Sequence, residues 1–319
     1  MIANLRLVLD VEVKAGNLGN SSHSLPGLIR LLDQLPLDSR PAFVRGDCDW
    51  GTDNIMNELE RKQYKYLFKM KRTKHVRTLI EQQHGKGKWT PFKKGWEAKE
   101  ATLSLSSWEL SRRVVLVRRQ LSNTNDLVIE HENEGQLNLS FIDKAENIKA
   151  FEYSVLVTNL PDDLISIVQH YRDRADCENN FDELKNQWGW CGYTTKQVKS
   201  CRLIARIIAL IYNWWTLYTR LLMPRSHLEA ITSRPLLLHS VGRLTETGRQ
   251  TKLSITNSHQ LNDVVVNAYH KVTPFFKWLK GAAPQLDNSE CWLAIINQIM
   301  SLLKVNSPID EWMSIEHSP

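Results

Sequence analysis

The chain has few of the features that would place it outside the cytoplasm. Its five cysteines form no C-x2-C pair and are odd in number, which argues against a zinc site and a disulfide framework. The first residues lack the basic and then apolar layout of a signal peptide, and no run of about 18 apolar residues occurs. The nearest stretch, 207–222, is interrupted by polar side chains and is expected to be a buried core helix. We therefore expect a cytoplasmic protein with no membrane partner.

Internal repeats and low-complexity tracts are also missing, and the composition is that of a globular protein. The 319 residues are 42% hydrophobic and carry a net charge of +6, a modest excess that favours an anionic partner. The distribution of this charge is more informative. One stretch with no acidic residue between its cations resembles a footprint for a phosphate backbone; its cations are Arg61, Lys62, Lys65, Lys69, Lys71, Arg72, Lys74 and Arg77, followed by Lys86, Lys88, Lys93 and Lys94.

Aromatic residues accompany these cations and could stack on bases or sugars. They are Tyr64, Tyr66, Phe68, Trp89, Phe92 and Trp96. The alternative is a structural role, because Tyr66 and Phe68 alternate with lysines as in a strand, and strand aromatics commonly belong to a core.

Hydrophobic periodicity predicts an α/β layer at the start of the chain, with a helical region at its end. A strand is expected within 2–14, followed by a helix over 25–35, a strand over 41–46, a short helix around 55–59, a strand over 64–70, a helix near 73–83 and a loop over 85–97. Strands alone are then expected from 101 to 158, including 127–130 and 136–141, and read as an antiparallel insertion. Helices are expected over 162–186, 197–222, 260–280 and 289–304.

These elements suggest four parts: a first part of the core (1–98), the antiparallel β insertion (99–160), a second part of the core with the helix described next (161–223), and a helical C-terminal region (224–319). The helix expected over 162–186 carries Tyr171, Arg174, Glu178 and Lys185. At about 100° per residue these four fall within roughly 60° of one helix face. That face continues an apolar stripe, and inward ionisable groups need partners or a metal. The alternative is a solvated amphipathic helix with an Arg174/Glu178 pair.

Asp47 follows the strand expected over 41–46, where strands of open α/β sheets commonly present ligands. Together, the carboxylates of Asp47 and Glu178 would suit Mg²⁺ or Mn²⁺ bound to a phosphodiester, with Arg174 and Lys185 holding DNA phosphates. The alternative for Asp47 is a loop-capping role.

The Tyr-x2-Arg-x3-Glu-x6-Lys spacing resembles the signature of DDE transposases of the bacterial insertion-sequence-four superfamily. The segments Val157-Thr-Asn-Leu-Pro and Phe43-Val-Arg-Gly-Asp47 resemble that family as well, and the likeness covers roughly residues 1–220. It implies a ribonuclease H-like mixed α/β sheet with an antiparallel insertion before the glutamate helix.

The resemblance also implies a cut-and-paste reaction in which water nicks the element end and the 3′-hydroxyl then attacks a second phosphodiester. Asp47 and Glu178 would be the second and third catalytic and metal carboxylates. Tyr171, Arg174 and Lys185 would bind DNA near the cleaved end. The implied partners are duplex DNA of the terminal repeats and target, and a second copy in a synaptic dimer, in the bacterial cytosol and nucleoid.

The family's first catalytic aspartate has no clear counterpart. Asp10 is the only acidic candidate on an early strand, yet the short segment before the helix at 25–35 leaves no room for two further strands, so Asp10 is expected on the third strand. We expect the aspartate-bearing first strand upstream of Met1. A site with two of its three carboxylates should bind Mg²⁺ weakly and cleave DNA poorly, if at all, and the missing strand should expose a sheet edge. Two alternatives stay open: a DNA-binding remnant without catalysis, and a ribonuclease H-like nuclease.

Overall fold

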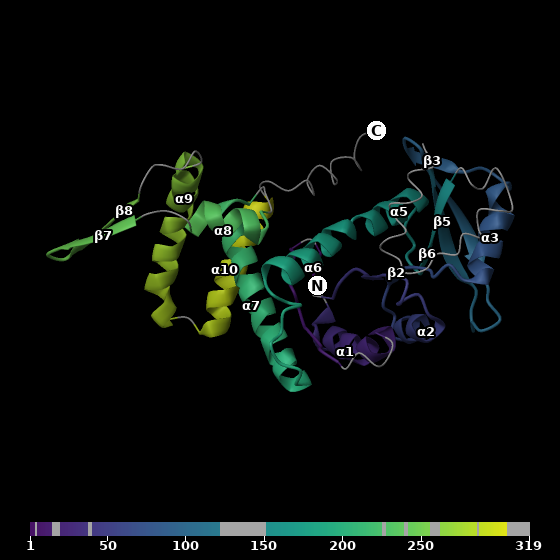
Figure 1. The fold of residues 1–319 in the computed structure, drawn as a ribbon, viewed down its shortest axis with the longest axis horizontal. Coiled ribbons are helices and arrows are strands. Elements are labelled where there is room, and N and C mark those ends of the chain that lie inside the picture. Colours follow the sequence, from purple (N-terminus) through teal and green to yellow (C-terminus); the bar gives the residue numbers. More distant parts are fainter. Residues whose placement is uncertain are drawn as a thin grey trace. The chain divides into compact units, whose positions relative to one another are not determined.

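The computed structural model describes residues 1–3, 5–14, 20–37, 40–121, 151–224, 228–238, 242–255, 262–285 and 287–304. The strands expected at 127–130 and 136–141 lie outside this part of the chain. Two compact units are present (Figure 1). We call Lys14–Asp176 the sheet unit, and Met1–Val13 together with Cys177–Pro319 the helical unit.

The sheet unit contains a six-stranded mixed sheet in the order β1-β2-β6-β5-β4-β3. Its strands are β1 (Val44–Gly46), β2 (Tyr66–Lys69), β3 (Thr90–Lys93), β4 (Trp96–Leu103), β5 (Arg112–Gln120) and β6 (Phe151–Thr158). β1 and β2 are parallel, whereas the other neighbours are antiparallel. The predicted mixed sheet is confirmed, and the antiparallel strands continue it rather than forming a separate layer.

Alternation along the strands places a core on each face of this sheet. On one face, Tyr66, Phe68 and Leu116 pack with residues of α1 (Asn20–Gln34), α2 (Asp53–Arg61) and α3 (Lys74–His84). The intervening residues face α5 (Leu164–Arg172) and form what we call the α5-side core: Leu67, Ala98, Val115, Val117, Leu156, Leu160, Ile167 and Val168. Figure 1 shows α3 and α5 on opposite sides of the central strands. The helices expected near 25–35, 55–59 and 73–83 are confirmed.

The helical unit consists of helices packed on two small cores. Its elements are α6 (Ala175–Gln187, which begins in the sheet unit), α7 (Val198–Leu222), α8 (Ala230–Leu238), the hairpin β7 (Gly242–Thr247) and β8 (Gln250–Ile255), α9 (Asn262–Ala282), the 3-10 turn η4 (Ala283–Gln285) and α10 (Asn288–Lys304). The predictions had no counterpart for α8 or the hairpin. None of the described helices has the length and apolar composition needed to cross a bilayer.

α7 is buried along one face only, which corrects the expectation of a buried core helix. Small residues such as Ala205 and Ala209 face the core with Tyr212. Large apolar side chains lie exposed on the helix: Leu203, Ile207, Leu210, Ile211 and Trp214.

The expected strand within 2–14 is wrong for the described residues, which contain only an isolated bridge between Ile2 and Leu7. Side chains of α7 replace a neighbouring strand here. The Asn213 amide donates to the Val8 carbonyl oxygen and accepts from the Val8 N–H, both at 2.8 Å. Because a helix satisfies this backbone, the apolar alternation of the segment does not place it in a sheet.

The expected loop over 85–97 is also wrong, because it contains β3 and the start of β4. These strands form a hairpin that turns at Lys94 and Gly95, where Gly95 has a φ of 75°. Glycine adopts this left-handed conformation without strain, which permits the tight turn.

The single helix expected over 162–186 is interrupted. α5 ends at Arg172 and α6 begins at Ala175, with a turn at Asp173 and Arg174. Tyr171 and Arg174 therefore do not share one continuous helix face with Glu178 and Lys185.

Candidate functional site

Asp47 lies directly after the last residue of β1, a strand that pairs in parallel with β2. Its side chain is exposed. One carboxylate oxygen, Oδ1, accepts the Asp49 N–H at 3.0 Å, and the Asp47 carbonyl oxygen accepts the Trp50 N–H at 3.2 Å. The loop-capping role considered for Asp47 is thus present, and it fixes the carboxylate without burying it.

Close packing holds the loop that carries Asp47. A Cβ on Gly46 would lie 2.7 Å from Cγ of Trp50, and a Cβ on Gly51 would lie 2.8 Å from the Lys69 carbonyl oxygen. The Trp50 ring in turn lies 6.3 Å from the Phe68 ring, centroid to centroid. Only glycine allows these approaches, so the backbone around Asp47 is set by steric contact.

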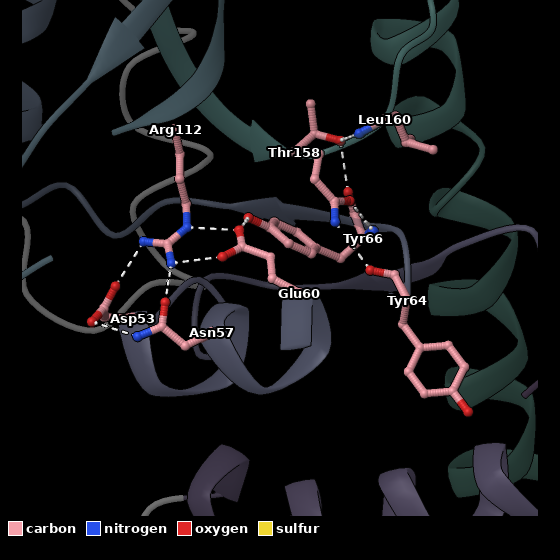
Figure 2. A network of polar contacts seen from close by, with 9 residues as sticks. Asp53, Asn57, Glu60, Tyr64, Tyr66, Arg112, Thr158 and Leu160 are labelled. Atoms are coloured by element: carbon pink, nitrogen blue, oxygen red, sulfur yellow. Dashed lines mark hydrogen bonds and ion pairs between the residues drawn. The ribbon is translucent and has the colours of Figure 1, made fainter. Parts of the chain in front are cut away.

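Arg112 of β5 fixes the helix that follows this loop (Figure 2). Its guanidinium donates to Asp53 Oδ1 at 2.7 Å, to both carboxylate oxygens of Glu60, at 2.9 and 3.0 Å, and to Asn57 Oδ1. The Tyr66 hydroxyl adds a donor to Glu60 at 2.6 Å. Arg112 is only 4% exposed, and these partners supply the hydrogen bonds that a buried cation needs.

Arg45, two residues before Asp47, joins β1 to the end of α5. Its guanidinium donates to the carbonyl oxygens of His170 and, at 3.1 Å, of Asp173. The Phe43 ring lies 5.2 Å from the His170 ring. Carbonyls in the last turn of a helix have no partner within the helix, and a guanidinium there stabilises its end. Arg45 therefore favours the break between α5 and α6.

Tyr171 and Arg174 lie together at this break. The Arg174 guanidinium lies 5.8 Å from the centroid of the Tyr171 ring, and its Nη1 donates to the Tyr171 hydroxyl at 3.3 Å. Both residues are half-buried. The pair presents a cation and a phenol held in one geometry, which suits a phosphate oxygen.

Glu178 and Lys185 lie on α6 and are exposed, so the prediction that they face inward is wrong. The buried face of α6 is formed by Asn180, Glu183 and Leu184 instead. The spacing of Glu178 and Lys185 still places both on one side of the helix. Asp47, Tyr171 and Arg174 belong to the sheet unit, and Glu178 and Lys185 to the helical unit.

Two side chains of α6 near Glu178 and Lys185 hold this helix to the start of α8: Glu183 and Gln187. The buried Glu183 carboxylate accepts the Ala230 N–H at the start of α8, at 2.9 Å, and the Trp188 indole N–H at 3.2 Å. The Gln187 side chain accepts the Ile231 N–H at 2.7 Å and donates to Glu229 at 2.7 Å. An acceptor at a helix start stabilises α8, and the same bonds hold the helix that carries Glu178.

Asp10 is exposed on a segment of the helical unit that is neither helix nor strand, and not on the third strand of a sheet. Its Oδ1 accepts the N–H of Val11 at 2.7 Å and pairs with Arg206 Nη2 at 3.1 Å. This local pairing gives Asp10 a structural role in the helical unit.

The sequence matches the family model described as Transposase DDE domain group 1 over residues 6–275. The chain belongs to the DDE transposase family. No match was found among curated proteins. The predicted family is confirmed at this level, and the transposase domain occupies most of the chain.

DDE transposases generally use divalent metal ions. Within the described part of this transposase, no group of three or more His, Cys, Asp or Glu residues is placed to hold one. Asp49, the acidic residue nearest to Asp47 in the sequence, pairs with Lys71 at 2.7 Å.

Most aromatic residues in the basic stretch of the transposase have a structural role. Tyr64, Tyr66, Phe68 and Trp89 are buried in the core, as the structural alternative predicted. Phe92 and Trp96 are half-buried and pack at the edge of the α5-side core. Among the cations, Lys62 pairs with Asp33 at 2.6 Å and Lys71 with Asp49.

Three residues that position the site were not identified from the sequence: Arg45, Arg112 and Glu183. Arg45 occurs within a quoted family segment, but its carbonyl partners lie 125 and 128 positions away. For Glu183, the only clue in the sequence was its position between Glu178 and Lys185.

Proposed function

We propose that this transposase cleaves and transfers DNA strands at the ends of an insertion sequence, as a member of the insertion-sequence-four superfamily. In this proposal Asp47 and Glu178 are catalytic carboxylates, and Mg²⁺ or Mn²⁺ is the expected ion. The observation that carries it is an exposed carboxylate, Asp47, held by steric contact at the end of a parallel strand in a chain of this family.

The proposed fold is ribonuclease H-like with an insertion over 99–160, of which most of β4 and all of β5 and β6 are described. The expected DNA contacts near the cleaved end are Tyr171, Arg174 and Lys185. Arg174 supports this role because its guanidinium is already oriented by Tyr171, so less side-chain entropy is lost when it binds a phosphate. The partners are duplex DNA of the terminal repeats and the target, and a second copy in the synaptic complex.

Strand nicking tests this proposal directly. The substrate is a labelled duplex carrying the ends of the element that encodes the chain, incubated with Mg²⁺ or Mn²⁺. Glu178→Gln should abolish nicking while leaving the unfolding temperature unchanged, because the side chain is exposed. Asp182→Asn, at another exposed carboxylate of α6, is the matched control and should retain nicking. Equal activity of both variants would contradict the role of Glu178.

A second candidate function is DNA binding without cleavage. The observation that favours it is the Tyr171–Arg174 pair, which lies within the sheet unit and can contact a phosphate without a metal ion. A chain of this kind would shift element-end DNA in a gel equally well with and without Glu178→Gln. It would also nick no DNA at any concentration of divalent ion, which separates it from the first candidate.

A further inference from the structure

The β3–β4 hairpin and the end of α5 share a cluster of rings and cations. Phe92 and Trp96 lie half-buried at the edge of the α5-side core. The exposed Arg172 places its guanidinium 6.0 Å from the Phe92 ring centroid and 5.8 Å from that of Trp96. Arg119 lies over Trp96 as well, at 5.6 Å. Ring contacts of this kind hold an arginine in place while leaving its N–H edge available.

The turn of the hairpin adds two exposed cations, Lys93 and Lys94. Within the described residues, no carboxylate pairs with Lys93, Lys94 or Arg172. Lys62 and Lys71 of the sheet unit differ, because each has a carboxylate within 2.7 Å. The charge at the hairpin is thus uncompensated locally, as in a surface that binds an anion.

This surface adjoins the residues expected to bind DNA. Tyr171 packs against the same α5-side core as Phe92 and Trp96, and Arg172 is its neighbour in the chain. Arg174 lies over the Tyr171 ring. The cations therefore continue from the α5–α6 turn to the tip of the β3–β4 hairpin within one unit.

We propose that Lys93, Lys94 and Arg172 bind the sugar–phosphate backbone of duplex DNA beyond the segment held by Tyr171 and Arg174. This inference rests on the proposed DNA-cleaving function and adds a contact surface to it. A backbone contact fits better than base stacking, because guanidinium groups already lie over the Trp96 ring. The lysines act as mobile point charges, and Arg172 as an oriented fork.

The test compares two double variants of the full chain with equal changes in charge. Lys93→Gln/Lys94→Gln removes the hairpin cations, whereas Lys65→Gln/Lys74→Gln removes two exposed cations of the basic stretch. Binding of a fluorescent duplex of arbitrary sequence is measured by anisotropy over a range of salt concentrations. The hairpin variant should bind about tenfold more weakly near 0.15 M salt, and its slope of log K against log salt should fall by about 2, at roughly 0.9 per phosphate.

Arg172 provides a second measurement on the same surface. Arg172→Gln should lower affinity and reduce the slope by about 1, and Arg172→Lys should recover part of the affinity because it keeps the charge. Circular dichroism and unfolding temperature should match those of the parent chain, since all three side chains are exposed.

An unchanged slope in the hairpin variant, or a larger loss in the Lys65/Lys74 control, would overturn the inference while leaving the proposed function intact. Weaker binding to single strands alone would show that duplex DNA is the wrong occupant. Failure of the parent chain to bind any duplex would overturn both. Loss of nicking in Glu178→Gln with an unchanged hairpin variant would support the proposed function alone.

Discussion

Arg112 donates to three side chains of α2, namely Asp53, Asn57 and Glu60 (Figure 2). Its guanidinium carbon also lies 5.0 Å from the Trp108 ring centroid. It supplies the positive charge for two carboxylates on a helix that begins six positions after Asp47. At the scale of single residues, this network connects the antiparallel strands to the segment behind the candidate site.

Removal of the Arg112 charge should strongly destabilise the sheet unit. In Arg112→Met, the carboxylates of Asp53 and Glu60 lose their cation, and breaking a buried ion pair in this way costs about 3–5 kcal/mol. Chemical denaturation should show this loss of unfolding free energy. Arg61→Met, which removes an exposed i,i+3 pair with Glu58, is the control and should cost much less. Similar losses in both variants would contradict the account.

The same network predicts a dependence of stability on pH. Burial acts to raise the pKa of Glu60, but hydrogen bonds from Arg112 and Tyr66 outweigh it, and the pKa lies below its usual 4.5. A carboxyl group with a lowered pKa stabilises the fold above its unfolded pKa, and this stabilisation is lost as the pH falls through the folded value.

Unfolding free energy should therefore decrease as the pH is lowered below about 4.5, the usual pKa of Glu60. Glu60→Gln should flatten this decrease. The unfolding free energies of the parent chain and of Glu60→Gln are measured by denaturation at pH 7 and at successively lower pH. Parallel curves for the parent and the variant would show that Glu60 contributes nothing to the pH dependence.

Spacing along the chain identified some of these residues and could not identify others. Tyr171 and Arg174 are three positions apart, so their contact was predictable from local geometry. Arg112 and Glu60 are 52 positions apart, and Arg45 and His170 are 125 apart. Contacts of this kind depend on strand order, which no local pattern encodes.

At the scale of elements, the break between α5 and α6 separates the predicted constellation. Asp173 and Arg174 still donate their N–H groups to the carbonyl oxygens of Gln169 and Tyr171, each at 3.0 Å. Arg45 donates to two further carbonyl oxygens here, those of His170 and Asp173. Arg45, two residues before Asp47, therefore holds the turn that precedes the helix of Glu178.

Arg45→Met should loosen this turn. The loss of two carbonyl contacts should speed hydrogen exchange of the Asp173 and Arg174 amides by about tenfold, given a contribution of roughly 1.4 kcal/mol from the charged donor. Arg72→Met removes a guanidinium contact with the Tyr153 carbonyl oxygen and is the matched control. It should leave these amides unchanged. Equal hydrogen-exchange rates in the parent chain and in Arg45→Met would show that Arg45 does not hold this turn.

Gly46→Ala should disturb the loop of Asp47. The added Cβ would lie 2.7 Å from Cγ of Trp50, so the ring must shift, at a cost of about 1–3 kcal/mol. Gly85→Ala is the control, because a Cβ there meets nothing within 4 Å. Thermal unfolding of the two variants measures the difference. A Gly46→Ala chain as stable as the control would show that the loop is not held by this contact.

Element prediction succeeded where periodicity was strong and failed where turns decided the structure. The helices around 25–35, 73–83 and 197–222 carry regular apolar spacing and were found. The hairpins β3–β4 and β7–β8 have turns at Gly95 and Gly248, each with positive φ, in segments rich in charge. Their polar faces hide the alternation that marks a strand.

At the scale of the whole molecule, the predicted α/β character and mixed sheet are confirmed, and the family match covers both units. The proposed carboxylates come from different units, Asp47 from the sheet unit and Glu178 from the helical unit. Composition and periodicity could suggest both parts. They could not show that α6 turns Asn180 and Glu183 inward rather than Glu178, because contacts distant in the sequence decide this, such as the bond from the Ala230 N–H of α8 to Glu183.

Nicking of element-end DNA by Asp47→Asn and Asp49→Asn distinguishes a catalytic carboxylate at Asp47 from one that only caps its loop. Each substitution removes one carboxylate charge from the same loop, but Asp49 is already paired with Lys71. Asp47→Asn should lose divalent-ion-dependent nicking by at least about 100-fold, roughly 2.7 kcal/mol of transition-state stabilisation, while it still binds the DNA. Asp49→Asn should retain nicking. Full nicking by Asp47→Asn would show that Asp47 is not a catalytic carboxylate.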